Sequence, residues 1–401
     1  MRRNLVVITV TAVLFGLSFG VYDLVLPLWL KTNGISYLQM GWIFAASNLM
    51  MMLVPIVAGW LADLFGRKRF FATSLASCAV ACLITPMTAN VAAQTGLRVI
   101  QRAAWGVYQS LQGVLVFETH RASFILSIRL ARGFEYTCNA LGAFLVWLLI
   151  RGQTSSDKLA MPMYVACGLL LVAFVMVVGW LREPEPDDAE PVRKGGFNPF
   201  GLPPVLILLA VFNFVFMLGL SLSHSQMMVL FFYEKFQLAE HHVAWVSILH
   251  RVSLGLPMIV AAFWVTRPNK WLFAATVALE GVFVSATVFP SSVVGAVAVW
   301  FVHDPIGAAI WAPMNSWYMQ HYARPDRRAA DVATVMAMTT LGTVIGPIVA
   351  GSLADYGGAV PAPLSGAIDL PFFVSGLIVV LSAALVCFLP KAQQDGTAEP
   401  H

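Results

Sequence analysis

The sequence predicts an all-α membrane protein with twelve transmembrane helices arranged as two six-helix bundles. Of its 401 residues, 59% are hydrophobic and 11% are charged, whereas a soluble domain carries about 25% charged residues. Apolar runs of about 20 residues, the length of a membrane-spanning helix, recur along the chain. A membrane barrel would instead show alternating segments of about ten residues. The runs form two sets of six, which predicts the two bundles.

A polar segment separates the two sets of predicted spans. The first set covers residues 4–30, 38–62, 69–89, 93–117, 127–150 and 161–181, and the second covers residues 203–232, 242–264, 271–290, 293–318, 331–355 and 371–389. The segment 182–202 is rich in Glu, Asp and Pro and cannot enter hydrocarbon. We therefore expect a bundle over 1–181, a cytoplasmic linker over 182–202, a second bundle over 203–390 and a cytoplasmic tail over 391–401. Many secondary transporters have this repeated layout.

The distribution of Lys and Arg predicts the orientation in the membrane, because cytoplasmic loops are enriched in both. If the N-terminus is cytoplasmic, the loops on that side carry fifteen basic residues: Arg2, Arg3, Arg67, Lys68, Arg69, Arg121, Arg182, Arg193, Lys194, Arg267, Lys270, Arg324, Arg327, Arg328 and Lys391. The opposite side carries four, namely Lys31, Arg151, Lys158 and Lys235. We expect a multi-pass protein of the cell inner membrane with both termini cytoplasmic.

The loop after the second predicted span has the sequence Gly-Trp-Leu-Ala-Asp-Leu-Phe-Gly-Arg-Lys-Arg, from Gly59 to Arg69. Glycines at 59 and 66 permit close helix approach and a tight reversal, and Asp63 can accept hydrogen bonds at a helix N-terminus. This segment resembles the signature loop of the major facilitator superfamily, G-x-L-a-D-x-x-G-R-[KR]-[KR]. The resemblance implies that the loop latches the two halves together in the outward-open state.

Other motifs extend the resemblance to the rest of the chain. Arg102 and Gly106 match the R-x-x-x-G pattern of the family's fourth span, and Glu118 occupies the place of an acid that contacts the signature-loop arginine, here Arg67. The eleventh span carries Gly342-Thr-Val-Ile-Gly-Pro347, which is similar to a pattern that family exporters have in the fifth span. Because the pattern is displaced, it is weak support for antiport. We predict a latch made of Gly59, Asp63, Gly66, Arg67 and Glu118.

Ionisable residues inside spans are candidate sites, because an unpaired charge in hydrocarbon is costly. At a rise of about 1.5 Å per residue, Asp23 and Arg102 lie at similar depths. The family resemblance implies that spans one, four, seven and ten line a central cavity, so we expect the two residues to face each other. An Asp beside an Arg stays ionised, and a change that separates them favours proton uptake. The alternative is a static ion pair that only fixes helix packing.

The tenth span carries His303, Asp304 and Asn315 near mid-membrane depth, and Pro305 is expected to loosen the helix there. A titratable pair beside a flexible point suits proton coupling or solute binding. His224, followed by Gln226, is a further candidate, although a lone buried His is often only hydrogen-bonded in place.

Among four other charged residues in the spans, Glu135 has more than one interpretation. Glu135 can couple to protons, reach Arg251 across the two halves, or pair with Arg132. We expect an Arg251–Glu280 ion pair because the two lie at similar depths on consecutive helices. Arg98 is expected near the outer surface, where its side chain can extend to water.

We therefore predict a secondary active transporter, and no enzyme, metal site or cofactor is expected from the sequence. The partners expected are a small, hydrophobic or amphipathic solute, protons and membrane lipids, with no nucleic acid, and the protein is expected to act as a monomer. Alternating access with proton antiport export is favoured over proton symport uptake of a small metabolite. A non-transporting sensor or assembly protein with the same fold is the alternative from another class.

Overall fold

The computed structural model describes residues 2–35, 37–149, 156–183, 201–224, 227–228, 231–238, 240–265, 267–357, 364, 366 and 368–391. Across these residues the chain is helical and contains no strand. Most of the predicted linker, nearly all of the predicted tail and Gln226 lie outside the described residues.

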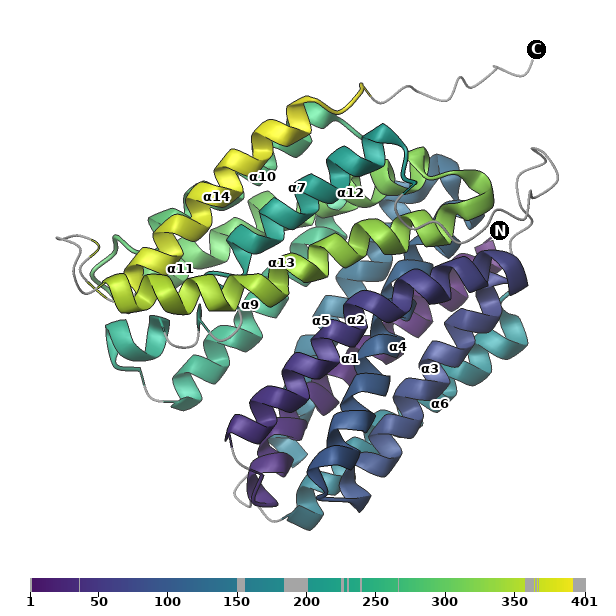
Figure 1. Cartoon of the computed structure of the whole chain (residues 1–401), viewed down its shortest axis with the longest axis horizontal. Coiled ribbons are helices and arrows are strands. Elements are labelled where there is room, and N and C mark those ends of the chain that lie inside the picture. Colours follow the sequence, from purple (N-terminus) through teal and green to yellow (C-terminus); the bar gives the residue numbers. More distant parts are fainter. Residues whose placement is uncertain are drawn as a thin grey trace.

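The N-terminal half contains six long helices (Figure 1). They are α1 (Arg2–Thr32), α2 (Tyr37–Phe65), α3 (Arg67–Ile84), α4 (Val91–Thr119), α5 (Phe124–Leu149) and α6 (Ser156–Trp180). Two 3-10 turns, η1 (Thr85–Met87) and η2 (Arg121–Ser123), adjoin α3 and α5. Each helix matches one predicted span to within a few residues.

The C-terminal half supplies the other six spans, two of which are interrupted. Its elements are α7 (Pro204–Leu220), η3 (Phe231–Lys235), α9 (Glu240–Ala261), α10 (Lys270–Ala286), α11 (Val293–His303), η4 (Asp304–Ala308), α12 (Ala309–Tyr322), η5 (Pro325–Arg327), α13 (Arg328–Gly357) and α14 (Asp369–Cys387). The tenth span is α11, η4 and α12 in sequence. The prediction of twelve helices in two bundles is confirmed.

Seven helical stretches in the described part of the chain are individually long and apolar enough to cross a membrane. Helices α4 and α5 are long enough but are not among them. These two helices carry Arg98, Arg102, Arg129, Arg132 and Glu135. A helix can hold such residues in a membrane only if they face protein or water rather than lipid. The charged side chains of α4 and α5 are therefore expected to face the interior of the protein.

The seventh span was predicted as one helix over 203–232, and this prediction is wrong. Helix α7 ends at Leu220, and residues 221–224 form turns. There the Ser221 hydroxyl donates to the Leu218 carbonyl oxygen at 3.1 Å, and the Ser223 hydroxyl donates to that of Leu220 at 3.1 Å. Side chains that bond nearby backbone carbonyls compete with the helical pattern, so the helix is interrupted here, and helical structure returns at residues 227–228 and in η3.

The tenth span contains the predicted irregularity beside Pro305. Residues Asp304–Ala308 form a π turn between α11 and α12. Proline has no backbone N–H to donate to the preceding turn, and π turns are a common way for a helix to absorb such a defect. The expectation that Pro305 loosens the helix is confirmed.

Two helix pairs make the most extensive contacts between the halves: α2 packs against α13, and α5 packs against α9. Small residues allow the second contact, since a Cβ on Gly133 would lie 3.0 Å from the carbonyl oxygen of Gly255. Close backbone approach at glycines is typical of helix packing in membranes. In Figure 1 the two bundles lie closest at the end where the N-terminus lies.

Candidate functional site

Asp23 lies in the interior of the N-terminal half, between α1 and α4. Its Oδ1 accepts hydrogen bonds from Arg98 at 2.7 Å and from Arg102 at 3.4 Å. The predicted contact between Asp23 and Arg102 is therefore present, but the shorter bond is to Arg98. The prediction that Arg98 reaches the outer surface is wrong, because this residue is only 2% exposed and also donates to Gln101 at 2.8 Å. Its position one turn from Arg102 directs both guanidinium groups to one carboxylate.

Aromatic rings surround this ion pair. The guanidinium carbon of Arg102 lies 4.7 Å from the Trp105 ring centre and 5.4 Å from that of Phe19. The two rings stack on each other with centroids 4.9 Å apart. Cations over aromatic faces are attracted by the ring quadrupole. A small cavity of about 10 Å³, the size of one water molecule, adjoins the site and is lined by Phe15, Ser18, Phe19, Tyr22, Cys78, Cys82, Gln101 and Leu170.

Glu135 is buried in α5 and faces α4. Its Oε1 accepts from Gln109 Nε2 at 2.5 Å, its Oε2 accepts from Gln112 Nε2 at 3.2 Å, and Arg132 lies 3.6 Å away. Of the alternatives open for Glu135, the structure contains the Arg132 pair. Arg251 instead donates to Asn139 of α5 at 2.5 Å.

The predicted ion pair between Arg251 and Glu280 is also wrong. Glu280 is 1% exposed and accepts a hydrogen bond from the indole N–H of Trp311 in α12. The Arg251 bond to Asn139 crosses from one half to the other. Helix α9 presents Arg251 to α5 rather than to α10. Similar depth of two residues in the membrane on consecutive helices is therefore insufficient to identify an ion pair.

His303 and Asp304 belong to a larger cluster in the C-terminal half. Asp304 Oδ2 lies 3.1 Å from His250 Nε2 and accepts from the Ser253 hydroxyl at 2.7 Å, while its Oδ1 lies 3.4 Å from His303 Nε2. The His224 ring completes the cluster, with its centroid 5.5 Å from that of His250 and 5.3 Å from that of His303. We refer to His224, His250, His303 and Asp304 as the imidazole cluster.

Sequence reasoning did not identify His250 as a site residue. It lies in α9, 26 residues after His224 and 53 residues before His303, and no spacing motif links positions so far apart. The one available signal was its place next to Arg251 within an apolar run. Asn315, predicted to bind solute or protons, pairs with Asn213 of α7: its side-chain amide donates to Asn213 Oδ1 at 2.8 Å and accepts from Asn213 Nδ2 at 3.2 Å.

The predicted latch residues meet at the interface of α2 and α13. Asp63 accepts from the backbone N–H groups of Ala329 at 3.2 Å and Ala330 at 3.0 Å, in the first turn of α13. The first N–H groups of a helix have no intrahelical partner, and the helix dipole favours an anion there. Gly59 permits this approach, because a Cβ on it would lie 2.6 Å from the Ala329 carbonyl oxygen.

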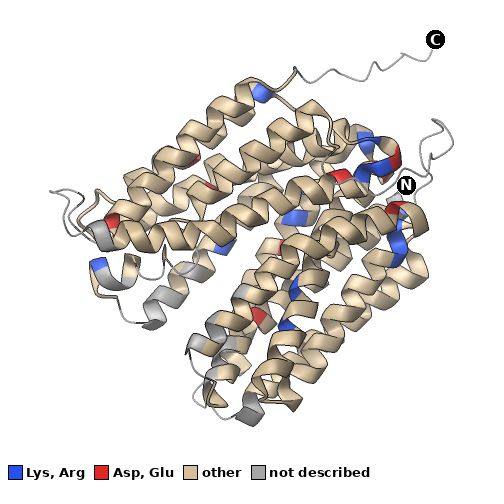
Figure 2. Cartoon of the chain, viewed as in Figure 1, with Lys and Arg blue, Asp and Glu red and all other residues tan. Residues whose placement is uncertain are grey.

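Arginines extend this contact. Arg67 donates to Asp63 at 2.8 Å and also to Glu118, and Arg328 of α13 donates to the same Glu118 oxygen at 2.8 Å. One carboxylate from α4 thus lies between two arginines from opposite halves. Figure 2 shows basic and acidic residues gathered where the turns before α3 and α13 meet. We call Asp63, Arg67, Glu118 and Arg328 the latch.

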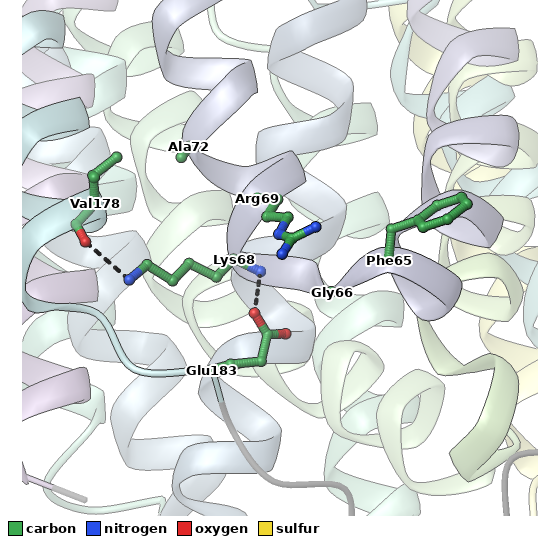
Figure 3. A pocket seen from close by; sticks show the side chains of 7 residues that line it. All are labelled: Phe65, Gly66, Lys68, Arg69, Ala72, Val178 and Glu183. Atoms are coloured by element: carbon green, nitrogen blue, oxygen red, sulfur yellow. Dashed lines mark hydrogen bonds between the residues drawn. The ribbon is translucent and has the colours of Figure 1, made fainter.

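The turn that contains Gly66 is held by a residue from the end of α6. Gly66 has a φ of 99°, which a glycine adopts readily. The Glu183 carboxylate accepts from the backbone N–H groups of Arg67 at 2.7 Å and Lys68 at 2.8 Å, and Lys68 Nζ donates to the Val178 carbonyl oxygen at 2.9 Å (Figure 3). Glu183 therefore caps α3 at the point where the linker begins.

A cavity of about 480 Å³ lies around this turn (Figure 3). Its lining residues are Phe65, Gly66, Lys68, Arg69, Ala72, Val178 and Glu183. Apart from Gly66, none is a predicted site residue. Its lining residues lie at the junction of α2 and α3 and near the end of α6. We regard the cavity as part of the latch region.

Arg129 makes a second contact between the halves that the sequence did not reveal. This fully buried residue of α5 donates to the backbone carbonyl oxygens of Ala261 at 2.9 Å, Ile310 at 3.1 Å and Val265. The carbonyls at a helix C-terminus lack intrahelical partners and favour a cation. Arg129 at the end of α9 and Asp63 at the start of α13 thus use opposite ends of the helix dipole.

Comparisons with known proteins agree with this architecture. The family model described as Major Facilitator Superfamily matches residues 8–233 and 212–400. The quinolone resistance protein NorA of Staphylococcus aureus strain MRSA252 is 23% identical over 416 residues, which cover 95% of this chain and 96% of that protein. NorA of strain MSSA476 is 24% identical over 390 residues, with the same coverage.

Solved structures share the fold. The human organic anion transporter MFSD10 superimposes with a TM-score of 0.77 at 16% identity, over 96% of this chain and 99% of that one. The Escherichia coli fucose:proton symporter FucP gives a TM-score of 0.77 at 14% identity, over 97% of this chain and 98% of that one. With two six-helix bundles, an intact signature loop and a family model matched along nearly its whole length, the chain belongs to the major facilitator superfamily and is a multi-pass membrane transporter.

Proposed function

We propose that this transporter exports a small hydrophobic or amphipathic solute across the cell inner membrane by proton antiport. The observation that carries the proposal is the partly exposed Asp23 carboxylate in the interior of the N-terminal half, held at 2.7 Å by Arg98 and at 3.4 Å by Arg102. A carboxylate in a membrane interior is stable when paired and takes up a proton when its cations move away. A movement between α1 and α4, or an incoming solute, that separates Asp23 from these arginines therefore links Asp23 to the proton gradient.

Glu135 is the second proton carrier in this proposal. Three of its contacts are with the neutral donors Gln109, Gln112 and Tyr108, and one is with Arg132 at 3.6 Å. Neutral partners can serve both the ionised and the protonated carboxyl group, so protonation leaves few buried groups unsatisfied. Asp304, His303, His224 and Asn315 stay predictions as residues that bind solute or protons.

The solute class follows from the surfaces around the ion pair. Phe19 and Trp105 are partly exposed and offer stacked aromatic faces beside the Arg102 cation. Such a surface suits a flat aromatic solute with a polar or ionised group. The NorA relatives are named quinolone resistance proteins, and this name supports the same chemical class. We therefore propose quinolone-like aromatic amphiphiles as substrates.

Alternating access requires that the halves separate at one membrane face while they close at the other. The latch and Arg129 close the end that the distribution of basic loop residues assigns to the cytoplasm. In this proposal the structure corresponds to an outward-facing state, both termini are cytoplasmic, the linker and tail extend from that face, and the protein acts as a monomer surrounded by lipid.

Flux measurements in proteoliposomes test this proposal. We expect the wild-type protein to move a fluorescent quinolone against its gradient when protons flow in the opposite direction, and not without a pH gradient. Asp23→Asn and Glu135→Gln should each lose most of the pH-driven flux. Asp326→Asn, a change in the η5 turn outside both the latch and the ion pair, should keep it.

Two results would contradict the proposal. One is pH-driven flux at the wild-type rate in both Asp23→Asn and Glu135→Gln. The other is uptake in the same direction as the protons, which would favour the alternative of symport. A protein with intact fold that moves no solute of any class would instead support the sensor alternative.

A further inference from the structure

We propose that the imidazole cluster is a binding site for a divalent transition-metal ion of the Zn²⁺ class. Imidazole nitrogens with one carboxylate oxygen are typical ligands of such ions, whereas Mg²⁺ and Ca²⁺ prefer all-oxygen sites. His224 follows α7, His250 lies in α9, and His303 ends α11. Ligand atoms of the three histidines all lie within 4.8 Å of one another.

The ring geometry is close to that of a tetrahedral site. With metal–nitrogen distances of about 2.0–2.1 Å, imidazole centroids around a tetrahedral ion lie about 5.2 Å apart. The three centroid separations here are 5.3, 5.4 and 5.5 Å. The ring centroids therefore already have the spacing of such a site, and binding requires the rings to turn toward a common centre.

Asp304 is the candidate fourth ligand because each of its two oxygens lies beside one of the histidines, and a small rotation of the carboxylate would turn one oxygen toward an ion between them. Asp304 Oδ2 lies 3.1 Å from His250 Nε2, and Asp304 Oδ1 lies 3.4 Å from His303 Nε2. The Ser253 hydroxyl donates to Oδ2 at 2.7 Å and so orients the carboxylate from outside. Hydrogen bonds from a neighbouring residue to a metal ligand are a regular feature of metal sites.

The hydrogen bonds of two histidines leave one ring nitrogen of each for a metal. His303 Nδ1 bonds the Trp300 carbonyl oxygen, and His224 Nδ1 lies 3.0 Å from the Leu220 carbonyl oxygen and 3.1 Å from the Ser223 hydroxyl. A carbonyl only accepts, so Nδ1 carries the proton and the Nε2 lone pair is available. His250 Nε2 and His303 Nε2 lie 3.1 and 3.4 Å from the Asp304 carboxylate, and neither makes a hydrogen bond of normal geometry in the described part of the chain. An ion between the rings and the carboxylate would satisfy both nitrogens.

The imidazole cluster is shielded from water on one side and accessible to solvent on another. Trp300 is fully buried, and its ring contacts all three imidazoles, with centroid distances of 4.4 to 5.5 Å. The His250 side chain keeps 18% of its surface exposed. An ion can therefore enter past His250, while Trp300 shields the opposite side and strengthens the electrostatic attraction to Asp304.

Co²⁺ spectroscopy on the purified, full-length protein tests the site directly. The protein should carry an affinity tag without histidines and be treated with a chelator first. We expect one equivalent of Co²⁺ to bind with the intense visible bands of tetrahedral coordination, and Zn²⁺ to displace it. Affinity should fall at least about tenfold in His250→Gln and in His303→Gln, and should be unchanged in His120→Gln, which lies in the turn before α5.

Absence of saturable Co²⁺ binding to the wild-type protein, an octahedral spectrum, or equal binding by the His250→Gln and His303→Gln variants would overturn the proposal. If the variants fail to fold, X-ray absorption of the Zn²⁺-loaded wild-type protein decides, since fewer than two imidazole ligands would contradict it. The inference does not depend on proton antiport, because binding is measured without transport.

Discussion

At the scale of single residues, carboxylates at helix N-termini connect parts of the chain that are far apart in sequence. Asp63 bonds two N–H groups at the start of α13, and Glu183 bonds two at the start of α3. Hydrogen bonds to a charged group contribute about 1.5–3 kcal/mol each. Asp63 joins the two halves, whereas Glu183 stabilises one half, so their removal should have different effects.

Asp63→Asn tests the first of these roles. The change keeps the size of the side chain but removes the charge that favours the α13 N-terminus and Arg67. We expect the end closed by the latch to open more often and transport to fall roughly tenfold, which corresponds to about 1.4 kcal/mol. Reaction of a cysteine at Gly113 with an impermeant maleimide should rise in Asp63→Asn and stay unchanged in Asp326→Asn.

At the scale of elements, the contact between α5 and α9 depends on small residues. A Cβ on Gly255 would lie 2.6 Å from the Thr137 backbone nitrogen and 3.0 Å from the Gly133 carbonyl oxygen. Overpacking of a tight interface costs about 1–3 kcal/mol. Because both atoms belong to backbone, the strain can be relieved only by moving one helix away from the other.

Gly255→Val should therefore separate the halves along this face and lower the pH-driven flux about tenfold. Distances between spin labels on α5 and α9 should increase in the variant. Gly168→Val in α6 is the matched control, since an added Cβ there meets nothing within 4 Å. Equal distances and equal flux for the two valine variants would show that the α5–α9 contact is not critical.

The ends of helices could be predicted from the sequence where a change in hydropathy marks them. They could not be predicted where local hydrogen bonds end the helix within an apolar run. The apolar runs gave eleven spans close to their observed limits, yet Ser221 and Ser223 ended α7 within an apolar run. Signature residues such as Asp63 could be assigned because the family motif names them. Arg129 and His250 could not, since backbone carbonyls and neighbours distant in sequence leave no local pattern.

At the scale of the whole molecule, the latch and Arg129 hold the halves together at one end. Both Asp63 and Arg129 bind backbone groups at helix termini, and most side-chain substitutions at the partner positions leave such groups in place. Gln320 of α12 also contacts the other half at this end. It packs on Gly113 of α4 so closely that a Cβ added to this glycine would lie 3.1 Å from Gln320 Nε2. Transport by alternating access requires that all these contacts break together.

Cross-linking across the closed end tests this requirement. In a background without the five native cysteines, Gly113→Cys with Gln320→Cys should be joined by a short thiol cross-linker. We expect flux to stop after cross-linking and to recover when a cleavable linker is reduced. Each single-cysteine variant should be unaffected by the reagent. Undiminished flux in the cross-linked protein would exclude separation of the halves at this end.

The π turn at Asp304–Ala308 has a geometric consequence for the tenth span. An extra residue in one turn rotates everything after it by about 100° relative to an uninterrupted α-helix. That offset lets α11 direct His303 toward His224 and His250 while α12 directs Trp311 toward Glu280. A one-residue deletion in this turn would rotate α12 by about 100° relative to α11. Either the contacts of His303 with the other histidines or the hydrogen bond between Trp311 and Glu280 would then be lost.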